Sequence, residues 1–203
     1  MARRTVSVND RTAPASGRTV GGPAIPDSAV WQDDFNDGNY DDWTVLSDSW
    51  SAANNYLEND GGGSGSKIAR LREYAYGYWE WDHRHDPNFY GSKTHFASDG
   101  SASDTTGPSN AYSINHKNEN NNYRRTLDKL VDGTKTELLD LGTYDGNWHT
   151  YRVEREDDGT FTVFVDGEDK GSVVDTEIDP STELVLGADD TGHDWDNFDV
   201  GTL

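Results

Sequence analysis

The amino-acid sequence contains no cysteine, so disulfide bonds, thiolate metal ligands and a cysteine nucleophile are all excluded. No run of about 18 apolar residues occurs either, and therefore no segment is expected to insert into a membrane. Basic residues are scarce, with 17 Lys and Arg against 38 Asp and Glu and a net charge of −21. Because phosphate binding needs a basic face, nucleic acid is excluded as the main partner.

Hydrophobic residues are few for a folded protein, yet many of them are aromatic. They make up 32% of the 203 residues, and 7 Trp, 10 Tyr and 6 Phe are among them. Each aromatic side chain buries a large area, so aromatics can supply a core where aliphatic residues are few. Disordered chains usually lack aromatics, and we therefore expect one folded domain of a size common among all-β sandwiches.

The acidic excess consists mainly of aspartate, and lysine is rare, a bias typical of proteins from extreme halophiles. Self-repulsion among so many like charges destabilises a compact state at low salt. Concentrated salt screens this repulsion, since the Debye length falls to about 3 Å at 1 M. The composition therefore predicts a salt-adapted protein. The alternative is an acidic protein that binds cations or basic partners.

Residues 1–29 differ from the rest of the chain, because four arginines stand there against two aspartates and no periodic apolar pattern occurs. Alone, such a segment is expected to be disordered. Two roles remain open: a tail folded back on its own acidic body, or an extended arm that grips a neighbouring subunit. No apolar stretch follows the paired arginines, so no export signal is expected. The assembly residues predicted for this arm are Arg3, Arg4, Arg11 and Arg18.

From residue 30 to 203, short alternating segments follow one another between Gly, Asn and Asp, and none has a sustained helical period. Asp158–Gly159 and Asp166–Gly167 are strong hairpin signals between such segments. This many short strands predicts an all-β sandwich or a closed barrel. The predicted strands are Val30–Phe35, Trp43–Leu46, Tyr56–Glu58, Lys67–Glu73, Tyr78–His85, Thr94–Ser98, Tyr112–Lys117, Tyr123–Leu130, Thr136–Leu141, His149–Glu156, Thr160–Val165, Glu168–Val174, Glu183–Gly187 and Trp195–Val200.

Four segments, in this order, resemble the concanavalin A-like lectin and glucanase superfamily, with laminin-G-like jelly rolls. They are VWQDDFNDGNYDDWTV, YAYGYWEWDHRH, NWHTYRVEREDDGTFTVFVDGEDKG and VLGADDTGHDWDNFDVGTL. The resemblance covers residues 30–203 and implies a two-sheet antiparallel jelly-roll sandwich behind the extended N-terminal arm. Its members include lectins, carbohydrate-binding modules, laminarinase-type glycosidases and adhesion domains, so the fold does not fix the function.

Catalysis by a relative of the laminarinases would need two carboxyl groups about 5 to 5.5 Å apart. Those relatives place them on one strand as Glu-x-Asp-x-x-Glu or Glu-x-Asp-x-Glu. Glu80 and Asp82 match the first two positions, but His85 or Arg84 stands at the third. Strand alternation also directs His85 to the opposite face. The sequence therefore favours a non-catalytic domain, with a glycoside hydrolase as the alternative.

Sugar binding needs polar side chains that reach hydroxyl groups, and an aromatic platform. The alternating polar positions 78 to 84 provide such a row, although a solvated row of ion pairs is the plain alternative. Trp79 and Trp81 alternate with this row and are expected in the core. Tyr90 and Trp50 lie near expected loops and are candidates to stack on a sugar ring. The predicted carbohydrate-binding residues are Tyr78, Glu80, Asp82, Arg84, Tyr90, His95 and Asn115, with His95 and Asn115 placed beside the row by their phase against Phe96 and Ile114.

The sequence allows two kinds of metal site. His83 and His85 share a strand face, but no third ligand at motif spacing supports a transition metal. The resemblance implies a structural calcium ion that joins the first and last strands. Asp34 and Asp196 match that site, and a carbonyl near Gly62 would complete it. The alternative is that both are ordinary surface acids in a very acidic chain.

Three classes of function compete: a glycan-binding or adhesion domain, a glycosidase, and a purely structural capsid subunit. Lectin-like folds usually act outside the cell, whereas no export signal is expected here. A protein folded in the host cytoplasm, built into a virus particle and released by lysis would reconcile these facts. We therefore predict a virion surface protein (turret, decoration or fibre) of a halophile virus, with an extracellular protein as the alternative. Its expected partners are neighbouring subunits, held by the arm in a homo-oligomer, and cell-surface glycans.

Overall fold

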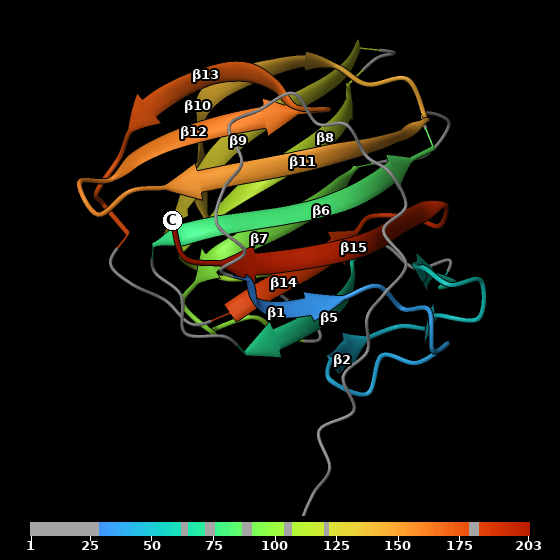
Figure 1. Cartoon of the computed structure of the whole chain (residues 1–203). Coiled ribbons are helices and arrows are strands. Elements are labelled where there is room, and N and C mark those ends of the chain that lie inside the picture. Colours follow the sequence, from blue (N-terminus) through green and yellow to red (C-terminus); the bar gives the residue numbers. More distant parts are fainter. Residues whose placement is uncertain are drawn as a thin grey trace, which may run out of the picture.

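The structure is a computed structural model that describes residues 29–61, 65–71, 76–86, 91–103, 107–119, 122–178 and 183–203. These residues form fifteen strands in two antiparallel sheets and no helix (Figure 1). In the described part, accordingly, no helix is long and apolar enough to cross a membrane. The predicted all-β, two-sheet sandwich is confirmed. Residues 1–28, with all four arginines of the predicted arm, lie outside the described residues.

The eight-stranded sheet has the order β13 (Glu168–Val174), β12 (Thr160–Val165), β11 (Trp148–Arg155), β6 (Gly77–His85), β15 (His193–Gly201), β4 (Leu57–Asn59) and β3 (Trp50–Ser51). The first strand, β1 (Ala29–Asp33), pairs with the last, β15. The seven-stranded sheet has the order β10 (Thr134–Thr143), β9 (Asn122–Val131), β8 (Ala111–Glu119), β7 (Ser92–Ser98), β14 (Glu183–Ala188), β5 (Ser66–Leu71) and β2 (Thr44–Ser47).

Every predicted strand overlaps an observed one, and β12 and β13 have the predicted bounds. The prediction missed β3, because two residues are too short to show an alternating pattern. The β12–β13 hairpin turns at Asp166 and Gly167, whose φ values of 53° and 77° are both positive. Asp-Gly is favoured where both central residues of a turn need positive φ, so the sequence signal has a direct backbone cause.

The core between the sheets is largely aromatic. Trp81 stacks on Tyr151 with ring centroids 5.7 Å apart, and Trp79 packs against Phe96 at 5.2 Å. Both tryptophans are buried, as alternation predicted. Trp50, a stacking candidate from its place near a loop, is also buried and packs 5.7 Å from Trp195, so that prediction was wrong. Truncating such a side chain to Ala costs about 3–5 kcal/mol.

Candidate functional site

The predicted polar row lies on β6, on the outer face of the eight-stranded sheet. Residues 79, 81, 83 and 85 of this strand are buried, whereas Glu80, Asp82 and Arg84 are partly exposed. The alternation predicted for the strand is therefore confirmed. Neighbouring strands place outward side chains opposite these three, namely those of β11 on one side and of β15 on the other.

Each member of the row is bound by a neighbour within the chain. The Tyr78 hydroxyl donates to Asp199 at 2.9 Å, and burial, with this carboxylate beside it, raises the pKa of Tyr78 to about 12. The guanidinium of Arg152 forms an ion pair with Glu80, with Nη1 3.3 Å from Oε2. Asp82 accepts hydrogen bonds from Thr150 and Asn197. Hydrogen bonds and an ion pair thus link the row to the neighbouring strands, as in the ion-pair alternative. Most polar groups of the row already have partners within the chain.

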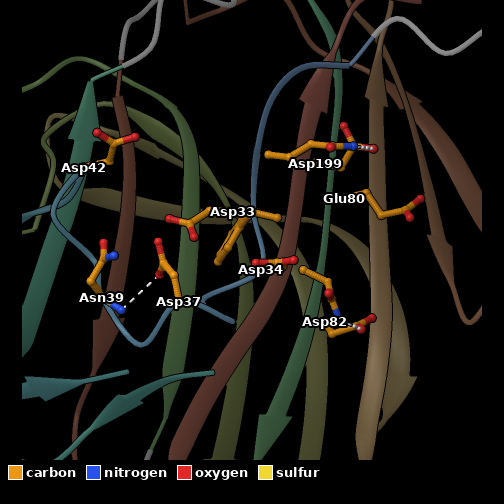
Figure 2. A pocket seen from close by; sticks show the side chains of 11 residues that line it. Asp33, Asp34, Asp37, Asn39, Asp42, Glu80, Asp82 and Asp199 are labelled. Atoms are coloured by element: carbon orange, nitrogen blue, oxygen red, sulfur yellow. Dashed lines mark hydrogen bonds between the residues drawn. The ribbon is translucent and has the colours of Figure 1, made fainter. Parts of the chain in front are cut away.

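The same face carries an acidic hollow of about 860 Å³ beside β1 and β15 (Figure 2). Figure 2 shows carboxyl groups from β1, the loop after it, β6 and β15 facing this space. Beside it, burial and the nearby carboxylates of Asp82, Asp34 and Asp33 raise the pKa of Asp196 to about 7. The hollow is lined by Gln32, Asp33, Asp34, Asp37, Asn39, Asp42, Glu80, Asp82, Asn197, Phe198 and Asp199.

The hollow is where the sequence predicts calcium. Oxygen ligands are present there, yet among the described residues no group of three or more His, Asp or Glu side chains is arranged to hold a metal ion. Asp34 and Asp196 instead accept backbone hydrogen bonds from Asn36 and Asn197. Gly62 lies outside the described residues. The carboxylates of the described residues do not by themselves form a complete calcium site, and calcium at Asp34 and Asp196 stays a prediction from the sequence.

The third position of the catalytic pattern lies inside the sandwich. His85 is buried on the inner face of β6, and burial lowers its pKa to about 2. It cannot share a substrate with Glu80 and Asp82, which point outward. His83 is buried beside it, and its Nδ1 donates to the Asp194 carbonyl at 2.7 Å. Together with His116 and His193 these rings form a buried histidine cluster with centroid separations of 4.3–6.5 Å.

His95 and Asn115 occupy the other side of the molecule. They lie on β7 and β8 of the seven-stranded sheet, so the prediction that they stand beside the β6 row was wrong. Phe96 and Ile114 lie in the core, as their phase predicted. Strand phase indicates which face of its own sheet a residue uses, but it carries no information on which sheet that is. Tyr90 lies outside the described residues.

Around His95 and Asn115, the outer face of the seven-stranded sheet carries a buried polar strip. His95 pairs with Ser113 across β7 and β8, Ser113 with Asp128 across β8 and β9, and Asn115 with Thr126. All five are buried, although they do not belong to the core cluster. We call these five residues the polar strip. Its residues are His95, Ser113, Asn115, Thr126 and Asp128.

The polar strip has unused hydrogen-bonding capacity. One internal bond runs from Asn115 Nδ2 to Asp128 Oδ2 at 2.9 Å. Among the described residues, these strip atoms have no hydrogen-bond partner: His95 Nδ1, Ser113 Oγ, Asn115 Oδ1, Thr126 Oγ1 and Asp128 Oδ1. Each such buried atom costs about 1–3 kcal/mol. The ammonium groups of Lys117 and Lys135 lie 3.6 and 3.9 Å from Asp128, on long side chains that can move aside.

One exposed aromatic was missed by the sequence reasoning. Trp148 begins β11, opposite Arg84 on the outer face of the eight-stranded sheet, and is 38% exposed. The signal was present, because Trp148 is in phase with the polar residues Thr150, Arg152 and Glu154 of the same strand. Phase alone would have directed this tryptophan outward.

No family model matches this sequence, and no curated protein matches it. Solved structures do share its fold. The carbohydrate-binding module CBM66 from Bacillus subtilis has a TM-score of 0.62 at 17% identity, over 80% of this chain and 95% of that one. A Bacillus licheniformis β-glucanase has a TM-score of 0.60 at 14% identity, over 85% and 98%. The Emp47p carbohydrate recognition domain has a TM-score of 0.66 at 12% identity, over 88% and 99%.

At these identities the likeness shows the fold alone, a two-sheet antiparallel jelly-roll sandwich. The neighbours include glucanases as well as a carbohydrate-binding module and carbohydrate recognition domains. Fold alone therefore leaves the activity to be argued from the side chains of this chain.

Proposed function

We propose that this protein is a non-catalytic glycan-binding domain whose ligand lies against the polar strip. The observation that carries this proposal is the set of unused donors and acceptors at His95, Ser113 and Asn115. A sugar hydroxyl both donates and accepts a hydrogen bond, so a row of hydroxyls matches imidazole, hydroxyl, amide and carboxylate groups side by side. Binding would relieve the cost that these atoms bear in the free protein.

Two further facts support sugar as the ligand class. The strip contains one carboxylate, Asp128, so no carboxyl pair for glycoside hydrolysis occurs within it. The carbohydrate recognition domain of Emp47p and the module CBM66 share the fold. On the opposite sheet, the pair Glu80 and Asp82 is engaged by Arg152, Thr150 and Asn197, which supports a non-catalytic role there too.

The composition of the chain also bears on where the domain acts and what it assembles with. We propose that the domain is displayed on a particle of a halophile virus, where the basic arm 1–29 holds an acidic neighbouring subunit in a homo-oligomer. Support for this consists of the arginines of the arm, the net charge of −21 and the salt-adapted composition. Deleting residues 1–28 tests it by sedimentation in 2 M NaCl. An assembly that survives the deletion would contradict the anchoring role.

A glycan array in 2 M NaCl, followed by calorimetry on each hit, tests the binding function. Asn115→Leu keeps the side-chain volume and removes the amide, and it should weaken binding at least tenfold, as should Ser113→Ala. The matched control is Thr162→Val, on the outer face of the other sheet, which should bind as the parent does. Near-UV circular dichroism confirms that each variant is folded. Flat binding across the array, or unchanged affinity in both strip variants, would contradict the proposal.

The absence of catalysis is tested separately by reducing-sugar release from β-1,3- and β-1,4-glucans. We expect no release above the protein-free rate. Release that disappears in Glu80→Gln would establish the glycosidase alternative.

A further inference from the structure

Trp148 stands apart from the other tryptophans of this protein. The remaining six are buried with at most 9% of their surface exposed, whereas Trp148 is 38% exposed. It begins β11 on the outer face of the eight-stranded sheet, on the side of the molecule opposite the polar strip. Among the tryptophans of this chain, Trp148 is therefore the one whose indole a ligand could reach from solvent.

The indole of Trp148 is held in place by two neighbours. Tyr56 meets it edge to face, with ring centroids 5.6 Å apart and an interplanar angle of 69°. The Arg84 guanidinium lies 5.2 Å from the centroid of Trp148 and 5.6 Å from that of Tyr56. Arg84 therefore lies over both rings, and more than a third of the Trp148 side chain stays exposed to solvent. We call Tyr56, Arg84 and Trp148 the aromatic platform.

A buried carboxylate fixes the guanidinium of the platform. Arg84 Nε donates to Asp194 Oδ2 at 2.7 Å, and a second Arg84 nitrogen lies 2.5 Å from the same oxygen. Asp194 is only 2% exposed, and its Oδ1 has no hydrogen-bond partner among the described residues. Burying the Asp194 carboxylate costs desolvation free energy, so a buried ion pair is weak evidence for a gain in stability. The pair does fix the orientation of Arg84 beside the exposed indole.

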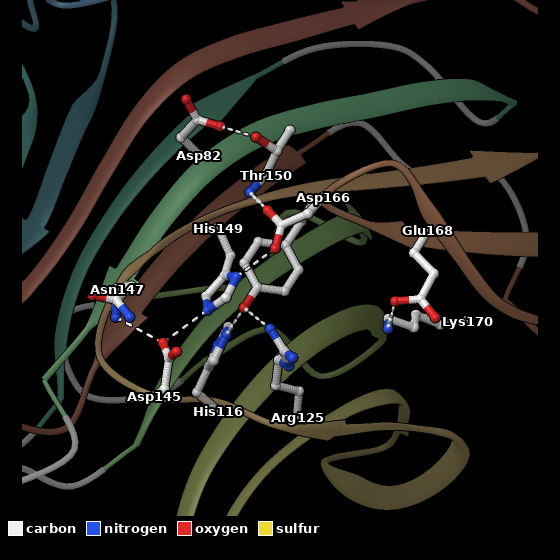
Figure 3. Close-up of polar contacts among 11 residues, drawn as sticks. Asp82, His116, Arg125, Asp145, Asn147, His149, Thr150, Asp166, Glu168 and Lys170 are labelled. Carbon is white, nitrogen blue, oxygen red and sulfur yellow. Dashed lines mark hydrogen bonds and ion pairs between the residues drawn. The ribbon is translucent and has the colours of Figure 1, made fainter. Parts of the chain in front are cut away.

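Polar side chains lie next to the aromatic platform, both on the neighbouring strands and two residues along the same strand. Across the strands, Glu58 of β4, Asp194, Arg84 and Trp148 lie in one line. Two residues along β6, about 7 Å away, Asp82 accepts a hydrogen bond from Thr150, as Figure 3 shows. Asp82 also lines the acidic hollow. A ligand ring on Trp148 would therefore have carboxylates within reach of its hydroxyls.

We propose that the aromatic platform is a second carbohydrate site, which takes a neutral sugar ring stacked on Trp148 with its hydroxyls bound by Arg84 and Asp82. A neutral sugar fits because Asp194 already neutralises Arg84 and the adjoining hollow is lined by acids, which repel anionic sugars. A single fixed aromatic among polar side chains suits a pyranose, whereas a protein partner would need a broader apolar patch. The site is separate from the polar strip and does not depend on it.

The test uses the full chain labelled with 5-fluorotryptophan, whose seven ¹⁹F resonances report each tryptophan separately. Trp148→Phe assigns the resonance of interest. Laminarihexaose, cellohexaose, xylohexaose and mannohexaose are the neutral probes, and hexagalacturonic acid is the anionic one. We expect at least one neutral probe to shift the Trp148 resonance in a saturable way, with the six buried tryptophans almost unmoved. Trp148→Ala should then weaken that binding at least about tenfold.

The variants separate this proposal from the function proposed for the polar strip. Asn115→Leu should leave the Trp148 shift intact, whereas Trp148→Ala should leave binding at the strip intact. Arg84→Lys keeps the charge but loses the planar guanidinium, and should weaken the platform several-fold. No Trp148 shift with any neutral probe, or a larger one with hexagalacturonic acid, would overturn the platform proposal. If the Trp148 shift is present but no binding depends on Asn115 or Ser113, only the polar-strip proposal is overturned.

Discussion

The carboxylate of Asp194 lies beneath the guanidinium of Arg84, joined to Nε at 2.7 Å, in a pair that links the two central strands β15 and β6. The acid is buried and the base is partly exposed. The same contact thus has two consequences. It positions Arg84 against Trp148 on the surface, and it makes a buried charge at the centre of the sheet depend on a single partner.

Arg84→Met should therefore destabilise the fold by about 1–3 kcal/mol, because it leaves the Asp194 carboxylate buried without its partner. Arg124→Met is the matched control, since Arg124 bridges Glu137 and Asp140 at the surface and should change stability much less. Urea denaturation at pH 7 measures both. Equal losses in the two variants would show that the buried carboxylate has no special cost.

The free-energy cost of burying the Asp194 carboxylate should also depend on pH. Burial raises its pKa from 3.8 to about 6, so the folded state binds the proton more tightly than the unfolded state does. Its contribution to stability is then fully present below about pH 4 and is lost as the pH rises through 6. The loss caused by Arg84→Met should accordingly shrink between pH 7 and pH 4. A pH-independent difference between variant and parent would contradict this assignment.

The buried histidine cluster should make the protein unfold in mild acid. Burial lowers the pKa of His83 to about 3, of His85 to about 2 and of His193 to about 4, and holds that of His116 well below 6.5. Each folded-state pKa is depressed, so stability is present above pH 6.5 and is lost as the pH falls. Each histidine contributes a slope of at most about 1.4 kcal/mol per pH unit, and the four together exceed the opposing effects of Asp194 and Asp196, whose pKa values are raised. Near-UV circular dichroism should show unfolding between pH 6 and 4.

His193→Leu tests the origin of that acid transition. Among the described residues, neither ring nitrogen of His193 has a hydrogen-bond partner, so leucine removes a titrating group without breaking a bond. The acid midpoint should move to lower pH. His149→Gln is the control, because that ring lies near the surface between Asp145 and Asp166 (Figure 3) and is not part of the buried cluster. A midpoint that moves only in the control would exclude the cluster as the cause.

The local part of this fold was predictable from sequence, whereas the lateral order of strands was not. Alternation correctly placed Trp79 and Trp81 inside, and the row from Glu80 to Arg84 outside. It also placed His95 opposite Phe96, but β7 and β6 lie in different sheets. An alternating pattern shows which face of the sheet a residue uses, but it does not show which strand lies next to it. The polar strip is assembled from β7, β8 and β9, so no single segment could have revealed it.

Gly77 should tolerate no side chain, because its backbone supports the junction of β6 and β15. Its φ is +132°, and a Cβ there would lie 2.1 Å from the Gly201 carbonyl oxygen. Gly77→Ala should therefore cost well over 1 kcal/mol. Gly133→Ala is the control, since Gly133 has a φ of +72° with open space around the position. The difference between the two in urea denaturation isolates the steric clash, and equal losses would show that only the backbone conformation matters.

Removing the charge of Asp196, beside the acidic hollow, should stabilise the protein, most of all at low salt. Burial and the neighbouring carboxylates raise the pKa of Asp196 to about 7, so its stabilising contribution is lost as the pH rises through 7. Asp196→Asn removes that charge but keeps a side-chain oxygen. That oxygen can still accept the hydrogen bond that the Asn197 backbone N–H donates to Asp196 Oδ1 at 2.8 Å. At pH 8 we expect the Tm to rise by roughly 2–4 °C in 0.1 M NaCl. In 2 M NaCl the gain should be smaller, because the Debye length is then below about 3 Å.

Asp157→Asn, in the exposed turn between β11 and β12, is the matched control and should raise the Tm less at 0.1 M NaCl. The same scans with 5 mM CaCl₂ examine the calcium prediction. If calcium binds at Asp34 and Asp196, it should raise the Tm of the parent and leave Asp196→Asn unchanged. If instead the hollow is simply a set of mutually repelling acids, calcium should shift both proteins alike and molar NaCl should replace it. A fall in Tm on Asp196→Asn without calcium would contradict the repulsion that the raised pKa implies.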